Sequence, residues 1–264
     1  MRKHFGFLLL MAAFLFSSCL DTEEKIVIHK NESGLYSVKV DLSRMFQMMK
    51  QMGQLDQLEG LDAHEKKDTT YYFKSVIDTV SSLSAKEKAL FKDGSIHISS
   101  DGEEGLMIVT LNFPFKQLSD LPQIKSSYPQ IIDKVIMSKA RETSDEDELK
   151  DIIPFNPGSE KSFLAPGIEA FRFTASPGKI ANRMVDANLF NERVENDSTL
   201  QMLQQMSVLM GDMNFKTVVE TPSKIKNFKG NQAVLSEDKK TVNFSTTFND
   251  MLNRAEAAEY SVEY

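Results

Sequence analysis

Residues 25–45 have the sequence KIVIHKNESGLYSVKVDLSRM, and this stretch decides the fold that we expect. Apolar and β-branched residues occupy segments 26–28 and 35–40. The polar, glycine-containing segment 31–34 separates them, which predicts a β-hairpin. The alternation ends at residues 41–43 (Asp-Leu-Ser), where a polar side chain can cap a helix. We therefore expect a hairpin that leads directly into a helix.

The same order of elements recurs along the chain. Residues 95–99 and 106–113 are candidate strands around a polar turn, and residues 233–235 and 241–248 form a similar pair followed by a short helix. Two further strands are expected at residues 171–175 and 215–220. These hairpins predict an α+β fold, in which amphipathic helices pack on one face of a mainly antiparallel sheet.

Several segments between the hairpins have the spacing of amphipathic helices. Ser84 and Glu87 match the capping-box pattern at the start of one helix. Pro129 is expected at or before the first turn of another, because proline cannot donate a helical hydrogen bond. The predicted helices span residues 70–80, 84–91, 127–140 and 200–210.

We expect residues 25–264 to form one domain, because the strand pair at 233–248 would complete the first sheet. Segment 54–67 is polar and is expected to be a linker. Segment 141–166 contains an acidic run and three prolines, and it is expected to be a long surface loop. The alternative is that segment 141–166 divides an N-terminal half from a C-terminal half.

Composition excludes several classes of function. The chain has 264 residues, with 38 acidic and 31 basic side chains, so its charge counts against nucleic acid as a partner. One cysteine excludes a disulfide framework and a cysteine-rich metal site. His29, His64 and His97 lack the spacing of a zinc motif, although His29 and His97 occupy similar places in two hairpins. The acidic run 145–148 lacks the ligand spacing of an EF-hand.

No motif for catalysis or cofactor binding is present in the sequence. It contains neither a Gly-x-Ser-x-Gly elbow nor a phosphate-binding glycine loop. Paired carboxylates could still meet in space, but the sequence nominates no pair. We therefore expect no enzyme activity, no catalytic residue, no metal and no cofactor.

The N-terminus has the features of a secretory signal peptide over residues 1–18. A short basic segment precedes the apolar run 5–16, and small residues follow it. Residues 16–19 (Phe-Ser-Ser-Cys) resemble the lipobox of bacterial lipoproteins, although Phe16 replaces the usual aliphatic residue. The resemblance implies cleavage after Ser18 and attachment of palmitate-type acyl chains to Cys19. The alternative is an ordinary signal peptide with a chance cysteine at its boundary.

Residues 19–24 are expected to form an acidic tether behind the lipid anchor. Their acidic character is similar to the surface-export signal of Bacteroidota lipoproteins, and the alternative is a solvated spacer without a signal. These resemblances imply a lipid-anchored protein of the bacterial cell envelope, at the outer membrane. Whether it faces the periplasm or the cell surface stays open.

The stretch after the tether also resembles a known family. Residues 25–45, with their strand, polar turn, strand and Asp-Leu-Ser order, are similar to the opening of LppM-like lipoprotein domains. The hairpin and helix at 235–252 are compatible with the same pattern. The resemblance implies an α+β lipid-associated envelope domain and carries over no catalytic residue.

Methionines are the residues that we single out for ligand binding. The chain has 14 of them, and many lie on two predicted helical faces that either line an adaptable apolar groove or fill the core. The candidate ligand-binding residues are Met45, Met48, Met49, Met52, Met206 and Met210. The favoured function is a non-enzymatic envelope lipoprotein that binds an apolar ligand or lipid. The alternatives are a scaffold subunit with an exposed apolar patch and a hydrolase with clustered carboxylates or histidines.

Overall fold

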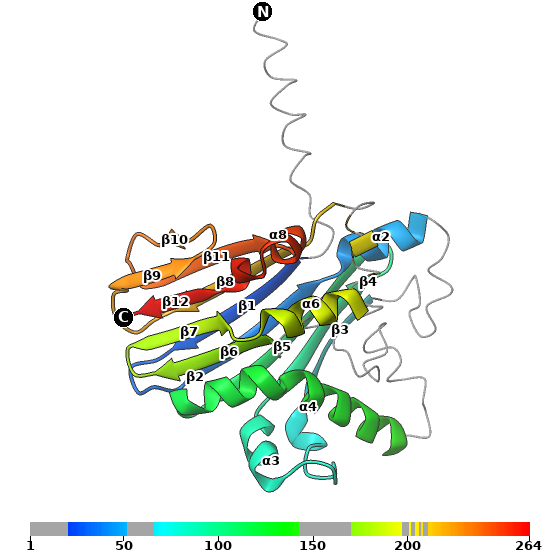
Figure 1. Ribbon diagram of the computed structural model, residues 1–264. Coiled ribbons are helices and arrows are strands. Elements are labelled where there is room, and N and C mark those ends of the chain that lie inside the picture. The colour runs from blue at the N-terminus through cyan, green and yellow to red at the C-terminus, as the bar shows by residue number, and fades with distance from the viewer. Residues whose placement is uncertain are drawn as a thin grey trace, which may run out of the picture.

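A large, mainly antiparallel sheet forms the centre of the computed structural model (Figure 1). The structure describes residues 21–51, 66–142, 170–196, 201, 204–205, 207 and 211–264. Within these ranges, the sheet has eight strands. From edge to edge they are β10 (Val234–Leu235), β11 (Thr241–Thr247), β8 (Asn214–Glu220), β1 (Asp21–Ile28), β2 (Gly34–Asp41), β5 (Leu106–Phe115), β4 (Ser95–Asp101) and β3 (Lys66–Tyr72). Neighbours are antiparallel, except that β1 and β8 are parallel.

The predicted α+β class is confirmed, and so are the predicted hairpins β1–β2, β4–β5 and β10–β11. Strand β1, however, begins at Asp21 and includes the acidic residues expected to form a tether. Glu23 lies opposite Lys39 of β2 and Lys216 of β8, and its Oε2 accepts a 2.8 Å hydrogen bond from Lys216 Nζ. The basic residues of neighbouring strands therefore allow an acidic segment to lie in the middle of the sheet.

A second sheet of four antiparallel strands covers part of the first. Its order is β6 (Phe171–Ser176), β7 (Lys179–Met184), β12 (Tyr260–Glu263) and β9 (Asn227–Gly230). The strand predicted at 171–175 is confirmed as β6, but the sequence did not predict a second sheet. Gly178 has a φ of +79° in the two-residue turn between β6 and β7, a conformation that glycine adopts without strain.

The small sheet and helix α4 (Leu121–Glu142) form one layer over the large sheet, as Figure 1 shows. Helix α4 contacts both β6 of the small sheet and β2 of the large one. Side chains of the large sheet alternate accordingly. Val38 and Leu111 are buried beneath this layer, whereas Lys39 and Thr110 lie on the opposite face. Helices therefore cover the predicted face, but they share it with strands.

The remaining helices are short. They are α2 (Ser43–Gln51), α3 (Ala85–Phe91), α6 (Ala187–Asn196) and α8 (Phe248–Asn253), with 3-10 turns η3 (Phe73–Ser75), η4 (Leu118–Asp120) and η6 (Ala255–Ala258). The predicted capping box at α3 is confirmed. The Glu87 N–H donates to Ser84 Oγ at 3.2 Å, and the Ser84 N–H donates to Glu87 Oε2 at 2.8 Å. Among the described helices, none has the length and apolar character needed to cross a membrane.

The helix predicted over residues 70–80 is wrong. The chain continues to Tyr72 as strand β3, which pairs with β4, and then forms η3 and a series of turns. Its apolar side chains are nevertheless buried, as helical spacing suggested: Phe73, Val76, Ile77 and Val80. Pairing with the neighbouring strand decides the structure of its first residues, and this partner lies far along the chain.

The expectation that Pro129 lies at or before the first turn of its helix is also wrong. Helix α4 begins at Leu121 and contains Pro129 in its interior. Proline has no N–H to donate to the carbonyl of Lys125, one helical turn earlier. Burial of Tyr128 and Ile132 on either side of the proline explains why the helix continues.

An aromatic cluster fills the core beneath α3 and α4. Phe113 of β5 lies at its centre and is only 1% exposed. Its ring centroid lies 5.5 Å from Phe91, 5.8 Å from Phe73 and Tyr128, and 6.3 Å from Tyr36. These distances are typical of favourable aromatic pairs, so this half of the core is solidly packed.

Candidate ligand-binding cavity

A cavity of about 130 Å³ lies between the two layers, where α4, the small sheet and the α8–η6 segment meet. Apolar and aromatic side chains from all of these elements line it, together with a few polar groups. The lining residues are Thr22, Glu24, Tyr36, Val38, Lys125, Tyr128, Phe171, Asn182, Phe215, Lys216, Thr217, Met251 and Ala258. Such a mixture of apolar walls and few polar groups is typical of small-molecule sites.

An ion pair in the wall distinguishes this cavity from an ordinary packing defect. Lys125 of α4 forms a salt bridge with Glu24 Oε1 of β1, and their side chains are 8% and 17% exposed. Lys125 Nζ also donates to the Tyr260 hydroxyl at 3.1 Å, and that hydroxyl donates to Glu24 Oε1 at 3.3 Å. The three groups form a closed triangle, which offsets part of the desolvation cost of the two charges.

Two aromatic rings lie close to the ammonium group. Lys125 Nζ is 5.1 Å from the ring centroid of Phe173 and 5.4 Å from that of Tyr260. At these distances the ring faces attract a cation. Lys125 is therefore held by a carboxylate, a hydroxyl and two rings, and its position in the wall is well defined.

The tyrosines beside the cavity keep their protons. Burial raises the pKa of Tyr36, Tyr128 and Tyr260 above the ordinary range, and the negative charge of Glu24 raises all three further. A hydrogen bond joins the hydroxyls of Tyr36 and Tyr128. These phenols consequently act as neutral hydrogen-bonding groups and supply no charge to the site.

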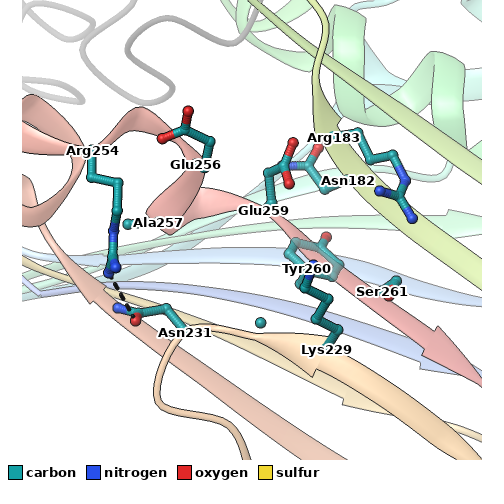
Figure 2. A pocket seen from close by; sticks show the side chains of 11 residues that line it. Asn182, Arg183, Lys229, Asn231, Arg254, Glu256, Ala257, Glu259, Tyr260 and Ser261 are labelled. Atoms are coloured by element: carbon teal, nitrogen blue, oxygen red, sulfur yellow. Dashed lines mark hydrogen bonds between the residues drawn. The ribbon is translucent and has the colours of Figure 1, made fainter.

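A second, more polar hollow of about 260 Å³ shares the lining residue Asn182 with the first cavity (Figure 2). Arg254 Nη2 donates to Asn231 Oδ1 at 3.4 Å, and Glu259 Oε1 accepts the Met184 N–H at 2.9 Å. Its lining residues are Asn182, Arg183, Lys229, Gly230, Asn231, Arg254, Glu256, Ala257, Glu259, Tyr260 and Ser261. Its charged groups of both signs and sparse apolar lining make it the less suitable place for an apolar ligand.

Of the methionines singled out from the sequence, Met45 and Met48 have described side chains, and neither lines one of these two cavities. Met45 is 7% exposed and belongs to the core beneath α2, and Met48 on the same helix is half-buried. Met49 lies in α2, while Met52, Met206 and Met210 lie outside the described residues. Their role as ligand contacts therefore stays a prediction. The predicted signal peptide 1–18 and the predicted lipidation site Cys19 also lie outside the described residues, so both stay predictions.

Glu24 and Lys125 are not among the residues predicted from the sequence, although each has a recognisable signal in it. Lys125 interrupts an apolar helical face formed by Leu121, Ile124 and Tyr128, all of which are buried. Glu24 lies on the same side of β1 as the buried Ile26, because side chains alternate along a strand. A lysine and a glutamate that each occupy an apolar stripe are candidates for a buried pair.

The histidines occupy separate places. His29 Nδ1 lies 3.2 Å from Ser33 Oγ in the turn after β1, and His97 of β4 contacts Thr70 and Asp68. His64 and the acidic run 145–148 lie outside the described residues. Within the described ranges, no three His, Cys, Asp or Glu side chains are grouped in a way that could hold a metal ion.

Exposed apolar residues are scattered in the part of the chain that the structure describes. The large ones are Tyr72, Val185 and Val234, which are 64%, 50% and 63% exposed. Tyr72 ends the edge strand β3, and Val234 belongs to β10 at the opposite edge of the large sheet. They do not form the continuous patch expected of a scaffold surface.

Comparison with known proteins gives one distant structural likeness. No protein-family model and no curated protein matches the chain. The chain is similar to the folded domain of the Mycobacterium tuberculosis LppM protein, determined by NMR, with a TM-score of 0.37 and 8% sequence identity. The likeness covers 94% of this chain and 91% of the LppM domain. At this distance it carries over neither residues nor activity.

Proposed function

We propose that the chain is a lipid-anchored, non-enzymatic protein of the bacterial cell envelope, located at the outer membrane, whose α+β domain binds a single-chain lipid. The cavity between the two layers carries this proposal. Phe171, Phe215 and Met251 offer apolar surface to a chain, and the pair Glu24–Lys125 offers a polar contact at one wall. A site that combines an apolar surface with a polar contact suits an amphipathic ligand.

The cavity volume limits the size of the ligand. Typical sites for drug-sized molecules have volumes of about 300–1,000 Å³, and this cavity has about 130 Å³. A bulky ring system or two acyl chains would require the layers to separate. One flexible chain can enter partly and leave the remainder outside, so we expect a single-chain lipid.

The predicted lipid anchor would bring this cavity to a membrane. Thr22 lines the cavity and lies only three residues after Cys19. Three extended residues span at most about 11 Å. Acyl chains on Cys19 would therefore hold this end of β1, and the cavity beside it, close to the bilayer surface. A lipid would have a short path from the membrane to the site.

Two measurements test the proposal. Metabolic labelling with a radioactive or alkyne-tagged palmitate should label the wild-type chain and should not label Cys19→Ala; labelling of the variant would refute the anchor. Native mass spectrometry of the full chain carrying Cys19→Ala, incubated with 1-monolauroylglycerol, should show a one-to-one adduct. A bare protein mass at saturating lipid would refute the cavity as a lipid site.

A filled cavity provides the matched control. Ala258→Phe adds a ring at a lining residue of the cavity and should abolish the adduct. Ala187→Phe makes the same change at an exposed residue of α6 and should keep it. Equal adduct formation by both variants would indicate that the lipid binds elsewhere on the protein.

A further inference from the structure

Among the described residues, the ion pair in the cavity wall has one acceptor atom and one N–H donor without a hydrogen-bond partner. Glu24 uses Oε1 for both Lys125 and Tyr260, and none of the described residues hydrogen-bonds its Oε2. An ammonium group has three N–H donors. Lys125 uses two of them, one for Glu24 and one for Tyr260. A ligand in the cavity can therefore donate to Oε2 and accept from the remaining N–H of Lys125.

The pair has no net charge. The other cation that lines the cavity, Lys216, directs its ammonium group to Glu23 Oε2 at 2.8 Å, on the opposite face of the sheet. The neighbouring phenols are neutral because burial holds their protons. The polar wall thus offers hydrogen bonds without an excess of positive or negative charge.

We infer that the ligand of this cavity carries an uncharged hydroxyl or amide group beside its chain, as in a monoacylglycerol, and that a fatty-acid carboxylate is rejected. The inference rests on the proposed lipid-binding function and specifies the class of lipid. A hydroxyl group both donates and accepts, so it satisfies Oε2 of Glu24 and the N–H of Lys125 together.

The negative charge of a ligand carboxylate would not be neutralised in this position. Its attraction to Lys125 would be opposed by repulsion from Glu24, which lies within bonding distance of the same ammonium group. Its own desolvation would then remain unbalanced. An ammonium group on the ligand would meet the converse problem, because Lys125 already occupies the position beside the rings of Phe173 and Tyr260.

The test compares two lipids with the same twelve-carbon chain. The full chain carrying Cys19→Ala is titrated at pH 8 with 1-monolauroylglycerol and with laurate, and the fraction bound is read by native mass spectrometry. We expect the monoacylglycerol to bind at least about tenfold more tightly, which corresponds to about 1.4 kcal/mol. Equal or tighter binding of laurate would overturn the inference while leaving the lipid-binding function intact.

Two nearly isosteric variants locate the source of this preference. Glu24→Gln leaves the charge of Lys125 uncompensated, so the preference should shift toward laurate by about tenfold or more. Glu220→Gln removes a carboxylate that pairs with Lys25, away from the cavity lining, and should keep the wild-type preference. An unchanged preference in a folded Glu24→Gln variant would overturn the inference.

If that variant does not fold, the comparison of the two lipids on the Cys19→Ala chain alone decides. Failure of both lipids to bind that chain would refute the proposed function together with the inference.

Discussion

The two halves of the covered sheet face differ in how completely they are filled. Over β5 and β4, helices α3 and α4 cover an aromatic cluster centred on Phe113. Over β1 and β8, the small sheet and the α8–η6 segment leave a cavity. Helix α4 forms the border, because its Tyr128 contacts Phe113 while its Lys125 faces the cavity.

The difference between the two halves follows from the shapes of the elements that pack in each. In the aromatic half, side chains of neighbouring elements interdigitate and four rings surround Phe113. In the other half, a helix, a sheet edge and a short helical segment converge, and their different shapes leave a gap. We expect the packed half to dominate the free energy of unfolding and the hollow half to determine binding.

Truncation of one phenylalanine in each half should separate these roles most strongly. Phe113→Ala should lower the free energy of unfolding by about 3–5 kcal/mol, because it removes a fully buried ring. Phe215→Ala, at a half-buried position beside the cavity, should lower it by about 1–2 kcal/mol and should weaken lipid binding. Urea unfolding followed by circular dichroism measures both, and equal losses would contradict the division into two halves.

The ion pair at the border should have the next largest effect. Lys125→Met leaves Glu24 buried without its cation and should lower the free energy of unfolding by about 3 kcal/mol. The double variant Glu24→Gln/Lys125→Met should recover a large part of this loss. Lys216→Met, which breaks the more exposed pair with Glu23, should have an effect of about 0–1 kcal/mol.

Thermal and urea unfolding of these variants show whether the buried pair Glu24–Lys125 contributes more to the free energy of unfolding than the exposed pair Glu23–Lys216 does. Equal effects of Lys125→Met and Lys216→Met would mean that Lys125 is not held as the contacts indicate. No recovery in the double variant would mean that the loss comes from packing of the lysine stem and not from the uncompensated carboxylate.

The packed half is the part that the sequence predicts best. Hairpin β4–β5 follows from alternation and turn residues, and the capping box of α3 follows from Ser84 and Glu87 alone. These features depend on residues close together in the chain, where spacing determines geometry. The buried residues of segment 70–80 were also recognisable, although the segment is not a helix.

The hollow half could not be predicted in the same way because its contacts join distant segments. Strands β9 and β12 have four residues each, too few for a periodic pattern, and they form because β12 pairs with β9 on one side and with β7 on the other. Glu24 and Tyr260 are 236 residues apart in the chain. The small sheet has two local signs: the strand predicted at 171–175, which is β6, and the Pro177-Gly178 pair after it, since Pro-Gly pairs often connect two strands.

Loss of the α3 cap should have a moderate effect confined to the packed half. Ser84→Ala removes the acceptor for the Glu87 N–H and should lower the free energy of unfolding by about 1 kcal/mol. Lipid binding should remain unchanged, because α3 does not line the cavity. Urea unfolding and the monolauroylglycerol titration check the two statements, and weaker binding would show that the two halves are coupled.

The smallest effect concerns a carboxylate on α4 and depends on pH. Desolvation raises the pKa of Asp133 to about 7, whereas an unfolded aspartate has a pKa of about 3.9. The folded state therefore holds this proton more tightly, and its stabilising contribution is present below pH 4 and is lost as pH rises through 7. Asp133→Asn should stabilise the protein above pH 7, by less than about 1 kcal/mol since the side chain is only half-buried. Thermal unfolding should show no difference from wild type near pH 4.

Asp93→Asn, at an exposed residue after α3, should retain the wild-type pH dependence. A stabilisation by Asp133→Asn that is equal at pH 4 and pH 8 would mean that the gain comes from packing or hydrogen bonding and not from the buried charge.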